Sequence, residues 1–406
     1  MKKPISYNIS PARGQAILNF QGRRFPDKIE LFENKLIEEV RLEDKSKSSK
    51  KDKQPELNSD FKNLLIHGDC LSACAYVKSQ NIKVDLVYID PPFASGANYA
   101  KVIYLHNEGK ENLKNKDNAI GEEIMYSDIW QKEDYLNWIY ERLLAIKDIM
   151  SDNGSIFVHL DATIGHYVKI LLDEIFGEIN FQREIIWRIG WVSGYKTNTQ
   201  NFIRNHDLIY YYTNNFDNKI FNKTYIQYPK NYTRRGGLEP TGKGYPLEDT
   251  WNCNEIDRLD SIQIMSFSPE KVDYVTQKNE NLLKRIIESC SNKDMIVADF
   301  FCGSGTAAKV ANDMGRKFIA CDIGLNAIQT SRDRLIESGA EFDILKINDG
   351  VRLFRNPAQT TAKIYSLING FKNKSELDIG DFWDGGIINK KGNFTPVKFI
   401  GIQEKL

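Results

Sequence analysis

The sequence lacks an excess of charge of either sign. Its 406 residues contain 55 lysines and arginines and 55 aspartates and glutamates. Net charge therefore does not indicate a nucleic-acid partner, and any surface that binds a polyanion has to be local. Closely paired cysteines are also absent, since none of the six cysteines forms a Cys-x-x-Cys pair and the five histidines are scattered. This pattern predicts neither a metal site nor a disulfide framework, and it indicates reduced thiols in the cytosol.

Long apolar runs are missing as well. None reaches the length that crosses a bilayer, and Met1–Pro4 is not followed by the apolar core of a signal peptide. We therefore expect no membrane segment. Hydrophobic residues nevertheless make up 41% of the chain, enough for a large core. The length suits two or three domains, or one α/β domain with insertions.

Apolar patterning predicts alternating strands and helices from Leu64 onward, which is typical of an α/β fold. The expected strands are 64–67, 83–89, 155–160, 184–188, 208–212, 295–300 and 317–321. The expected helices are 70–80, 135–150, 168–176, 281–290, 307–314 and 325–337. One further helix is expected at 27–41, ahead of this pattern.

Four stretches interrupt the alternation. Residues 43–56 are charged and rich in serine, which predicts a solvated linker, and 94–128 predicts a long polar loop of the kind that forms lids. Residues 216–275 interleave basic and aromatic side chains with glycines. That composition suits contacts to phosphates and bases, and it also fits an ordinary surface insertion. Residues 351–406 predict a small appended β element.

The most informative residues are Asp90-Pro91-Pro92-Phe93, which directly follow the expected strand 83–89. They place a carboxylate, a rigid pair of prolines and an aromatic ring at the end of a strand. Prolines have no backbone donor, so carbonyls in this pair can point at a ligand without competition. The carboxylate and one carbonyl can accept the two hydrogens of an exocyclic amine, while the ring stacks on a planar base. A plain turn after a strand is the alternative.

A second motif follows the expected strand 295–300. Phe301-Cys302-Gly303-Ser304-Gly305-Thr306 forms a glycine-rich turn before a helix, where a ligand can approach the backbone closely. It lacks the third glycine of a dinucleotide-binding turn and the Gly-Lys-Ser/Thr of a phosphate loop. With Asp299 before it, the turn matches S-adenosylmethionine binding better. Asp322, at the end of the next strand, can bind ribose hydroxyls, and NAD remains the alternative ligand.

Together the two motifs resemble those of β-class amino-DNA methyltransferases, the N6-adenine enzymes in particular. In that family the Asp-Pro-Pro-Phe/Tyr block precedes the Phe-x-Gly-x-Gly block, with a target-recognition insert between them, and this order is found here. The resemblance covers 62–345 and includes Leu65–Cys70, Gly154–Asp161 and Thr276–Lys278. It implies a Rossmann-like, S-adenosylmethionine-dependent methyltransferase fold of the α/β class, with a circularly permuted mixed sheet and an inserted target-recognition region.

The permutation and the insert divide the chain. In the permuted sheet, 295–300 and 317–321 are the first two strands, and 64–67 and 83–89 are the third and fourth. The implied parts are an N-terminal extension with a charged linker (1–60), a catalytic half (61–215), the target-recognition insert (216–275), a cofactor-binding half (276–350) and a C-terminal extension (351–406). The first and last parts lie outside what the family explains.

The resemblance assigns roles to individual residues. The expected catalytic residues are Asp90, Pro91, Pro92 and Phe93. The expected S-adenosylmethionine contacts are Asp69, Cys70, Asp90, Gln277, Lys278, Asp299, Phe300, Phe301, Cys302, Gly303, Ser304, Gly305, Thr306 and Asp322. The expected DNA contacts are Lys230, Arg234, Arg235 and Lys243. Asp69 has a second interpretation as a helix N-cap, and Asn279 stands where the family has proline after Thr-Gln-Lys.

The implied activity is transfer of a methyl group from S-adenosylmethionine to N6 of an adenine flipped out of double-stranded DNA. N4 of cytosine is the nearest alternative target, although that block more often begins with serine than with an aspartate such as Asp90. A cytosine-C5 enzyme is excluded by the absence of a Pro-Cys dipeptide, and the order of the motifs argues against an RNA methyltransferase. A DNA-binding subunit without catalysis stays open. The family allows a homodimer and a cognate restriction endonuclease as partners, in the cytoplasm or nucleoid of a prokaryote.

Overall fold

The structure of the chain is a computed structural model. It describes residues 5–10, 17–42, 61–93, 98–104, 119–127, 132–188, 200–228, 233–251, 270–272, 274, 276–349, 371–373, 377, 385–388 and 394–397. The chain divides into two compact units, Met1–Asp349 and Gly350–Leu406. Of the helices within these ranges, none has both the length and the apolarity required to cross a bilayer.

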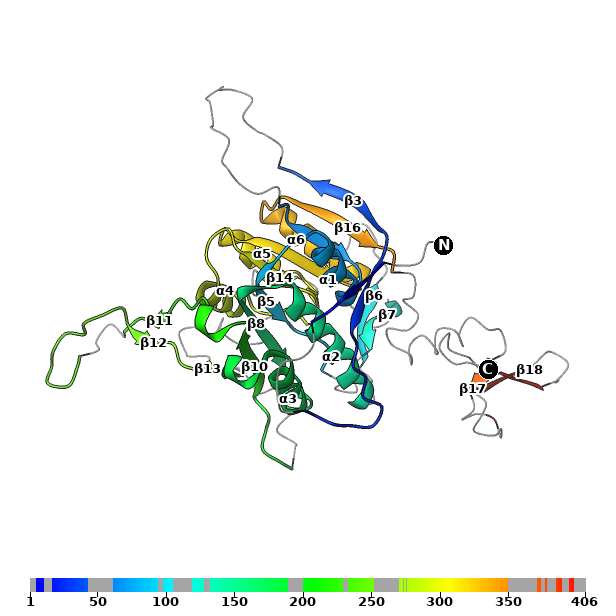
Figure 1. The fold of residues 1–406 in the computed structure, drawn as a ribbon, viewed down its shortest axis with the longest axis horizontal. Coiled ribbons are helices and arrows are strands. Elements are labelled where there is room, and N and C mark those ends of the chain that lie inside the picture. Colours follow the sequence, from blue (N-terminus) through cyan, green and yellow to red (C-terminus); the bar gives the residue numbers. More distant parts are fainter. Residues whose placement is uncertain are drawn as a thin grey trace, which may run out of the picture. The chain divides into compact units, whose positions relative to one another are not determined.

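A mixed β-sheet forms the centre of the first unit (Figure 1). In the described part of the chain, its spatial order is β13 (Thr250–Trp251), β9 (Phe181–Arg188), β10 (His206–Thr213), β8 (Met150–Leu160), β5 (Val84–Ile89), β14 (Ile296–Asp299), β15 (Lys317–Asp322), β4 (Leu64–His67), β16 (Phe342–Ile347) and β3 (Asn34–Val40). The strands from β8 to β16 in this order are parallel to one another. β10 runs antiparallel to both of its neighbours, and β3 runs antiparallel to β16.

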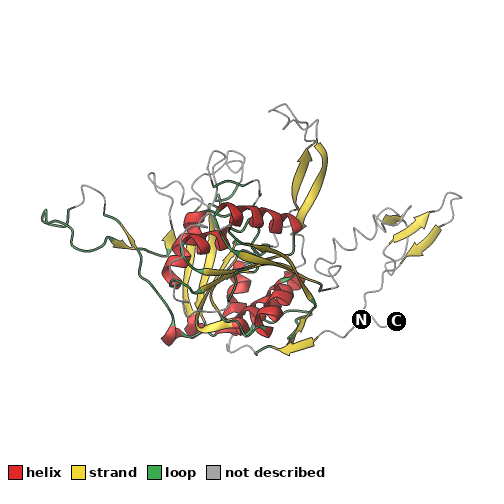
Figure 2. Ribbon diagram, turned by 90° about the horizontal axis from the view of Figure 1, so that it is seen from above, coloured by secondary structure: helices red, strands yellow, loops and turns green. Residues whose placement is uncertain are grey.

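Helices cover both faces of this sheet (Figure 2). One face packs against α1 (Cys70–Ser79), α2 (Lys132–Ile149) and α3 (Gly165–Phe176), and the other against α4 (Glu280–Cys290), α5 (Thr306–Asp313) and α6 (Leu325–Glu337). Successive residues of β5 alternate between the two cores, with Val87 and Ile89 on the first face and Leu86 and Tyr88 on the second. Burial on both faces explains why the parallel strands are almost continuously apolar in sequence.

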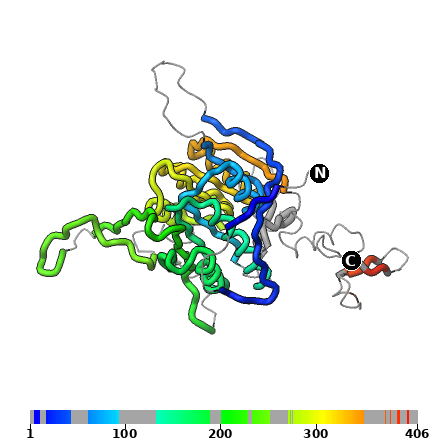
Figure 3. Tube along the Cα trace, in the orientation of Figure 1, coloured from blue at the N-terminus to red at the C-terminus, as the bar shows by residue number. Residues whose placement is uncertain are grey.

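The predicted order of the permuted strands is confirmed. β14 lies between β15 and β5, and β15 lies between β14 and β4, so segments far apart in the sequence form one sheet (Figure 3). From β14 the chain continues to β15 on one side, whereas from β5 it continues to β8 on the other. Such a reversal leaves a crevice at the carboxyl ends of the two strands. The residues after β14 and those after β5 therefore meet there.

The expected helix at 27–41 is wrong. This segment forms β2 (Lys28–Leu31), which pairs with β1 (Ile5–Asn8), and β3, which pairs with β16 at the edge of the main sheet. β16 was itself absent from the expected strands. Pairing with a strand that is distant in sequence outweighs local propensity, because strand stability depends on the partner strand and on burial.

The stretch 94–128 also differs from the polar loop that was predicted, since β6 (Asn98–Tyr104) pairs antiparallel with β7 (Ala119–Ser127). Inside the predicted insert, β11 (Tyr225–Ile226) pairs with β12 (Tyr245–Pro246). In the second unit, β17 (Phe371–Asn373), β18 (Gly385–Ile388) and β19 (Phe394–Val397) form an antiparallel sheet, which confirms the appended β element. The linker predicted at 43–56 lies outside the described residues.

Candidate active site

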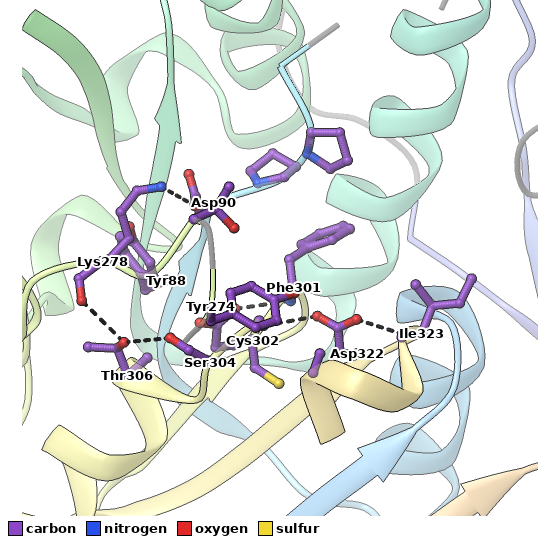
Figure 4. A pocket seen from close by; sticks show the side chains of 18 of the residues that line it. Tyr88, Asp90, Tyr274, Lys278, Phe301, Cys302, Ser304, Thr306, Asp322 and Ile323 are labelled. Atoms are coloured by element: carbon purple, nitrogen blue, oxygen red, sulfur yellow. Dashed lines mark hydrogen bonds and ion pairs between the residues drawn. The ribbon is translucent and has the colours of Figure 1, made fainter. Parts of the chain in front are cut away.

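The turn after β5 carries the first functional side chains. Asp90 forms an ion pair with Lys278 through Oδ2, whereas its Oδ1 is buried and has no hydrogen-bond partner among the described residues (Figure 4). An unpaired buried acceptor is costly, so Oδ1 is available to a donor on a ligand. The Lys278 Nζ also lies 5.7 Å from the centroid of the Phe93 ring. One ammonium is thus close to both the carboxylate and the ring.

Lys278 lies in the segment that precedes α4, and α5 holds its backbone in place. Its backbone carbonyl accepts a hydrogen bond from Thr306 Oγ1 at 3.2 Å. The neighbouring Gln277 is used inside the segment, because its Oε1 accepts from the Val272 N–H at 2.8 Å and its Nε2 donates to the Glu270 carbonyl at 2.5 Å. Gln277 therefore shapes the backbone from which Lys278 extends.

Asn279 occupies the position where the family has proline. Its side-chain oxygen accepts from the Asn281 N–H at 2.8 Å and caps α4, and its Nδ2 donates to Glu270 Oε1 at 3.1 Å. Proline has no side-chain acceptor and could make neither contact. Asn279 thus starts α4 in a defined position without the proline.

The glycine-rich turn after β14 is closely packed against its surroundings. Gly303 and Gly305 have φ angles of +49° and +72°, which residues with a side chain rarely adopt. A Cβ on Gly305 would lie 2.7 Å from Ser331 Oγ, and a Cβ on Gly303 would lie 3.1 Å from the ring of Tyr274. The backbone conformation therefore favours glycine at both positions, and at Gly305 the lack of space does so as well.

Asp322, at the end of β15, holds the same turn from the side. Its Oδ2 accepts a hydrogen bond from the Gly303 N–H at 2.9 Å, and its Oδ1 accepts one from the Gly324 N–H at 2.8 Å. The carboxylate is therefore fixed in orientation at the wall of the cavity described below.

Asp299 is the most deeply buried carboxyl of the site. Its Oδ1 accepts from the Phe301 N–H at 3.0 Å. Burial, together with the negative charges of Asp90 and Asp322, raises the pKa of Asp299 well above its ordinary value, although the Phe301 hydrogen bond opposes this. Three carboxyl groups therefore meet in one place, which favours a cationic ligand.

These groups line a cavity of about 330 Å³ at the carboxyl ends of β5, β14 and β15. The predicted residues that line it are Asp90, Pro91, Pro92, Phe93, Lys278, Asp299, Phe301, Cys302, Gly303, Ser304, Thr306 and Asp322. The fold thus brings both sequence motifs to the wall of one cavity.

Comparison with known proteins identifies the family. The sequence profile of the DNA methylase family, of the N6/N4 type, matches residues 84–333, which contain both motifs. The chain belongs to the DNA methylase family.

The relatives of this chain are distant from it in sequence. The chain is 25% identical over 316 residues to the type II methyltransferase M.EcaI of Enterobacter cloacae, an alignment that covers 62% of this chain and 64% of that protein. It is 24% identical over 273 residues to the DNA adenine methyltransferase YhdJ of Escherichia coli strain K12, covering 67% of this chain and 82% of that one. It spans 26% of the EcoP15I Mod subunit of Escherichia coli, over 41% of its own length and at 28% identity.

Solved structures that match part of the chain include M1.HpyAVI in complex with SAM. That structure has 21% sequence identity and a TM-score of 0.40, and the match covers 67% of this chain and 100% of that chain. The cytosine-N4-specific PvuII DNA methyltransferase has 14% identity and a TM-score of 0.40, over 67% of this chain and 86% of that one.

The cavity fits S-adenosylmethionine, the methyl donor of this family of DNA methylases. Asp299 suits the ammonium of the methionine end, and Asp322 suits the ribose hydroxyls. The Nδ2 of Asn326, in the first turn of α6, is buried without a hydrogen-bond partner among the described residues and lines the same cavity. Phe301 and Ile323 supply apolar wall beside it. The unpaired donor, the carboxylates and the apolar wall together match a cationic nucleoside.

Some predicted cofactor contacts do not line the cavity, namely Asp69, Cys70, Gln277, Phe300 and Gly305. The carboxylate of Asp69 accepts two hydrogen bonds from Arg142 Nη2, at 3.1 and 2.8 Å, and caps α1 by accepting from the Leu71 N–H at 2.9 Å. This supports the N-cap interpretation of Asp69. Its contact with the cofactor stays a prediction of the family resemblance.

Other residues of the cavity were missed from the sequence. Tyr88, Tyr274, Ile323 and Asn326 line it. Tyr88 belongs to an apolar strand and looks like core, and Tyr274 lies in a segment without periodicity. Asn326 lies only four residues after the predicted ribose-binding Asp322, so that motif could have been extended to it.

The predicted DNA contacts lie in the insert. Arg234, Arg235 and Lys243 are exposed and none of the three lines the cavity, while Lys230 lies outside the described residues. Arg234 Nη2 donates to the Thr241 carbonyl at 3.1 Å and so braces its own loop. The exposed side chains of Arg235 and Lys243 carry a guanidinium and an ammonium group, respectively.

Proposed function

We propose that this chain transfers a methyl group from S-adenosylmethionine to the N6 amine of an adenine in double-stranded DNA. The observation that carries the proposal is that the two oxygens of the Asp90 carboxylate differ. Oδ2 pairs with Lys278, whereas Oδ1 is buried and has no hydrogen-bond donor among the described residues. An amine N–H is such a donor. The Pro91 carbonyl is the second acceptor in this proposal, because Pro91 lines the cavity directly beside Asp90.

Reaction at an amine then depends on positioning and electrostatics more than on a strong base. S-adenosylmethionine supplies a methyl group that its sulfonium makes electrophilic. Asp90 and the Pro91 carbonyl accept the two N6 hydrogens, which draws the nitrogen toward tetrahedral geometry and localises its lone pair. Phe93 stacks on the base and fixes its plane. Asp90 also stabilises the positive charge that develops on the amine until the methylated nitrogen releases one proton to solvent, so no covalent enzyme intermediate is required.

N6 of a paired adenine lies inside the stack, so the target base has to flip out of the duplex to reach the cavity. The exposed Arg235 and Lys243 of the insert support contact with DNA phosphates there. By name, the relatives include a type II methyltransferase and the Mod subunit of a type III restriction-modification enzyme. We infer a cytoplasmic enzyme with a cognate restriction endonuclease as its partner, and a homodimer as its assembly.

N4 of cytosine carries a similar amine and would use the same two acceptors. The aspartate at the first position of the catalytic turn supports adenine, as does the likeness to a protein named a DNA adenine methyltransferase. The buried, unpaired oxygen of Asp90 supports catalysis over a silent DNA-binding subunit, because retaining such an oxygen would only destabilise a subunit that has no use for it.

The test is methylation-sensitive long-read sequencing of DNA from cells that express the chain, compared with cells that express Asp90→Ala. We expect N6-methyladenine at one sequence context with the natural chain, and none with the variant. Cytosine methylated at N4 would instead identify cytosine as the target base. Unmodified DNA with the natural chain would rule out the activity.

The purified Asp90→Ala protein completes the test. We expect it to lose transfer of labelled methyl groups to DNA while its affinity for S-adenosylmethionine, measured by calorimetry, is largely kept. Asp217→Ala is the matched control, because Asp217 is an exposed carboxylate in a surface turn. Retained transfer by Asp90→Ala would remove the role assigned to this carboxylate.

A further inference from the structure

His159 lies directly behind the catalytic turn, and the methyl-transfer chemistry leaves it unexplained. It is fully buried near the end of β8. Its Nδ1 is 2.9 Å from the Tyr88 hydroxyl, and its Nε2 is 3.4 Å from Asp207 Oδ2, which is longer than an ordinary hydrogen bond. The imidazole thus bridges β5 and β10 from the strand between them.

The same imidazole also meets the aromatic ring that is expected to hold the base. The centroids of the Phe93 and His159 rings are 6.2 Å apart, with 33° between their planes. The Tyr88 ring lies at the same centroid distance of 6.2 Å, at 73°. Tyr88 precedes Asp90 in the sequence and Phe93 follows it. The His159 ring therefore contacts the catalytic turn on both sides of Asp90.

The turn needs such a support because of its own sequence. Pro91 and Pro92 have no N–H groups, so this part of the backbone cannot donate hydrogen bonds that would fix it. Lys278 fixes the carboxylate of Asp90. Side-chain packing can fix the Phe93 ring, and His159 contributes to it together with the Lys278 ammonium, which lies 5.7 Å from the ring centroid.

Asp207 faces the other nitrogen of the imidazole, Nε2, which is buried and has no hydrogen-bond partner among the described residues. Asp207 is 5% exposed, and its Oδ1 accepts from Arg204 Nη2 at 2.6 Å. Burial opposes the ionisation of Asp207, but its contact with His159 and the positive charges of Arg204 and Lys278 outweigh this and lower its pKa below the ordinary value. Asp207 is therefore a carboxylate at neutral pH and favours a proton on the imidazole Nε2.

Tyr88 is suited to the other ring nitrogen. Burial, followed by the negative charges of Asp90, Asp299 and Asp207, raises the pKa of Tyr88 well above its ordinary value, so the hydroxyl keeps its proton. It can then donate to Nδ1 while Nε2–H faces Asp207. A single tautomer and ring orientation satisfies both neighbours.

We propose that His159, oriented by Tyr88 and Asp207, is a positioning residue that sets the place of the Phe93 ring and thereby the stacking of the target base. The inference rests on the proposed function, in which Phe93 stacks on a flipped adenine. It predicts that changes at His159 alter the stacking of the target base and the rate of methyl transfer, and leave the affinity for S-adenosylmethionine unchanged.

The experiment uses the full chain and a duplex that carries the sequence identified by methylation sequencing. In a second duplex, 2-aminopurine replaces the target adenine, because its fluorescence rises on flipping and is quenched by stacking on an aromatic ring. Three quantities are measured: the single-turnover rate of methyl transfer, the affinity for S-adenosylmethionine by calorimetry, and the fluorescence of the bound 2-aminopurine duplex.

The variants distinguish a loss of the contacts that position Phe93 from a general loss of folding. His159→Leu removes the polar contacts and the ring, and we expect a loss of up to about 100-fold in transfer rate with unchanged cofactor affinity and brighter 2-aminopurine. His159→Gln can still accept from Tyr88 and donate to Asp207, so it should recover part of the rate. Tyr211→Phe is the control: it removes a buried hydroxyl that contacts Cys290 on the same sheet face, away from the catalytic turn.

Two results would overturn the inference: a folded His159→Leu protein with the natural rate and fluorescence, or a loss of cofactor affinity as large as the loss of rate. If melting curves show that His159→Leu does not fold, Tyr88→Phe carries the test, because it removes only one hydroxyl. A natural transfer rate and fluorescence in Tyr88→Phe would then overturn the inference. Absence of transfer by the natural chain would instead remove the proposed function, and the inference with it.

Discussion

Lys278 pairs with one oxygen of the Asp90 carboxylate and leaves the other oxygen buried and unpaired among the described residues. The two residues are 188 positions apart in the sequence. Their contact joins the turn after β5 to the segment before α4. We infer that Lys278 acts on the acceptor of the amine, while the cofactor contact expected from its motif stays a prediction.

Lys278→Met separates these two roles. Without the ammonium, Asp90 is a buried carboxylate next to Asp299 with no counter-charge, and the turn loses its anchor. We expect the single-turnover transfer rate to fall about 100-fold while calorimetry finds nearly natural affinity for S-adenosylmethionine. Lys309→Met is the control, since Lys309 pairs with Glu280 and Asp313 outside the cavity. A variant that loses cofactor affinity in step with rate would restore the cofactor role.

Gly305→Ala tests the packing of the cofactor turn. A left-handed residue with a side chain costs roughly 1–2 kcal/mol, and at Gly305 the added Cβ would also lie 2.7 Å from Ser331 Oγ. Gly22→Ala isolates the first cost, because Gly22 has a φ of +74° with nothing within 4 Å of the added Cβ. We expect urea unfolding to show a larger loss of unfolding free energy for Gly305→Ala than for Gly22→Ala. Equal losses would mean that Ser331 moves aside freely.

The sequence predicts the parallel core well for a physical reason. β4 and α6 begin and end where they were expected, at 64–67 and 325–337. Strands buried on both faces are apolar throughout, and α6 stops before the Ser338-Gly339 turn, so local residues mark these bounds. The order of the strands followed from the order of the two motifs.

The failures have a common cause, since each depends on contacts between distant segments. Within 27–41, β3 forms because β16 offers an edge and β2 forms against β1, and nothing within the segment indicates either partner. Tyr88 looks like a core residue until the fold places it on the cavity wall. Lys278 lies beside Gln277 in the motif, yet Gln277 binds its own loop while Lys278 reaches Asp90. Sequence spacing identifies such residues but does not divide their tasks.

The exposed basic residues of the insert give a prediction about DNA. Each phosphate contact that is lost lowers the dependence of log K on log salt concentration by about 0.9. We expect the double variant Arg235→Gln and Lys243→Gln to bind a DNA duplex more weakly and with a slope that is smaller by up to about two such contacts. Fluorescence anisotropy at several salt concentrations measures this, with the exposed Lys346→Gln on β16 as the control. An unchanged slope would place the phosphate contacts elsewhere.

Asp299→Asn should stabilise the chain and weaken its function. Asn keeps an acceptor for the Phe301 N–H but removes a charge buried beside Asp90 and Asp322. The pKa of Asp299 is raised above its ordinary value of 3.8, so the folded state binds this proton more tightly than the unfolded state. The stability that the proton provides is present at low pH and is lost as the pH rises through the raised pKa.

At neutral pH the buried charge of Asp299 therefore lowers the unfolding free energy of the natural chain, and the variant has no such loss. We expect Asp299→Asn to raise the unfolding free energy at pH 7 by about 0.5–2 kcal/mol, with a gain that shrinks as the pH falls toward 3.8. Thermal melts at several pH values measure the difference, and Asp217→Asn, at an exposed carboxylate, should show no such trend. Calorimetry should find weaker binding of S-adenosylmethionine to Asp299→Asn, because a carboxylate facing the cationic methionine end is lost. A stability gain that grows on acidification would contradict the raised pKa and the electrostatic account of the site.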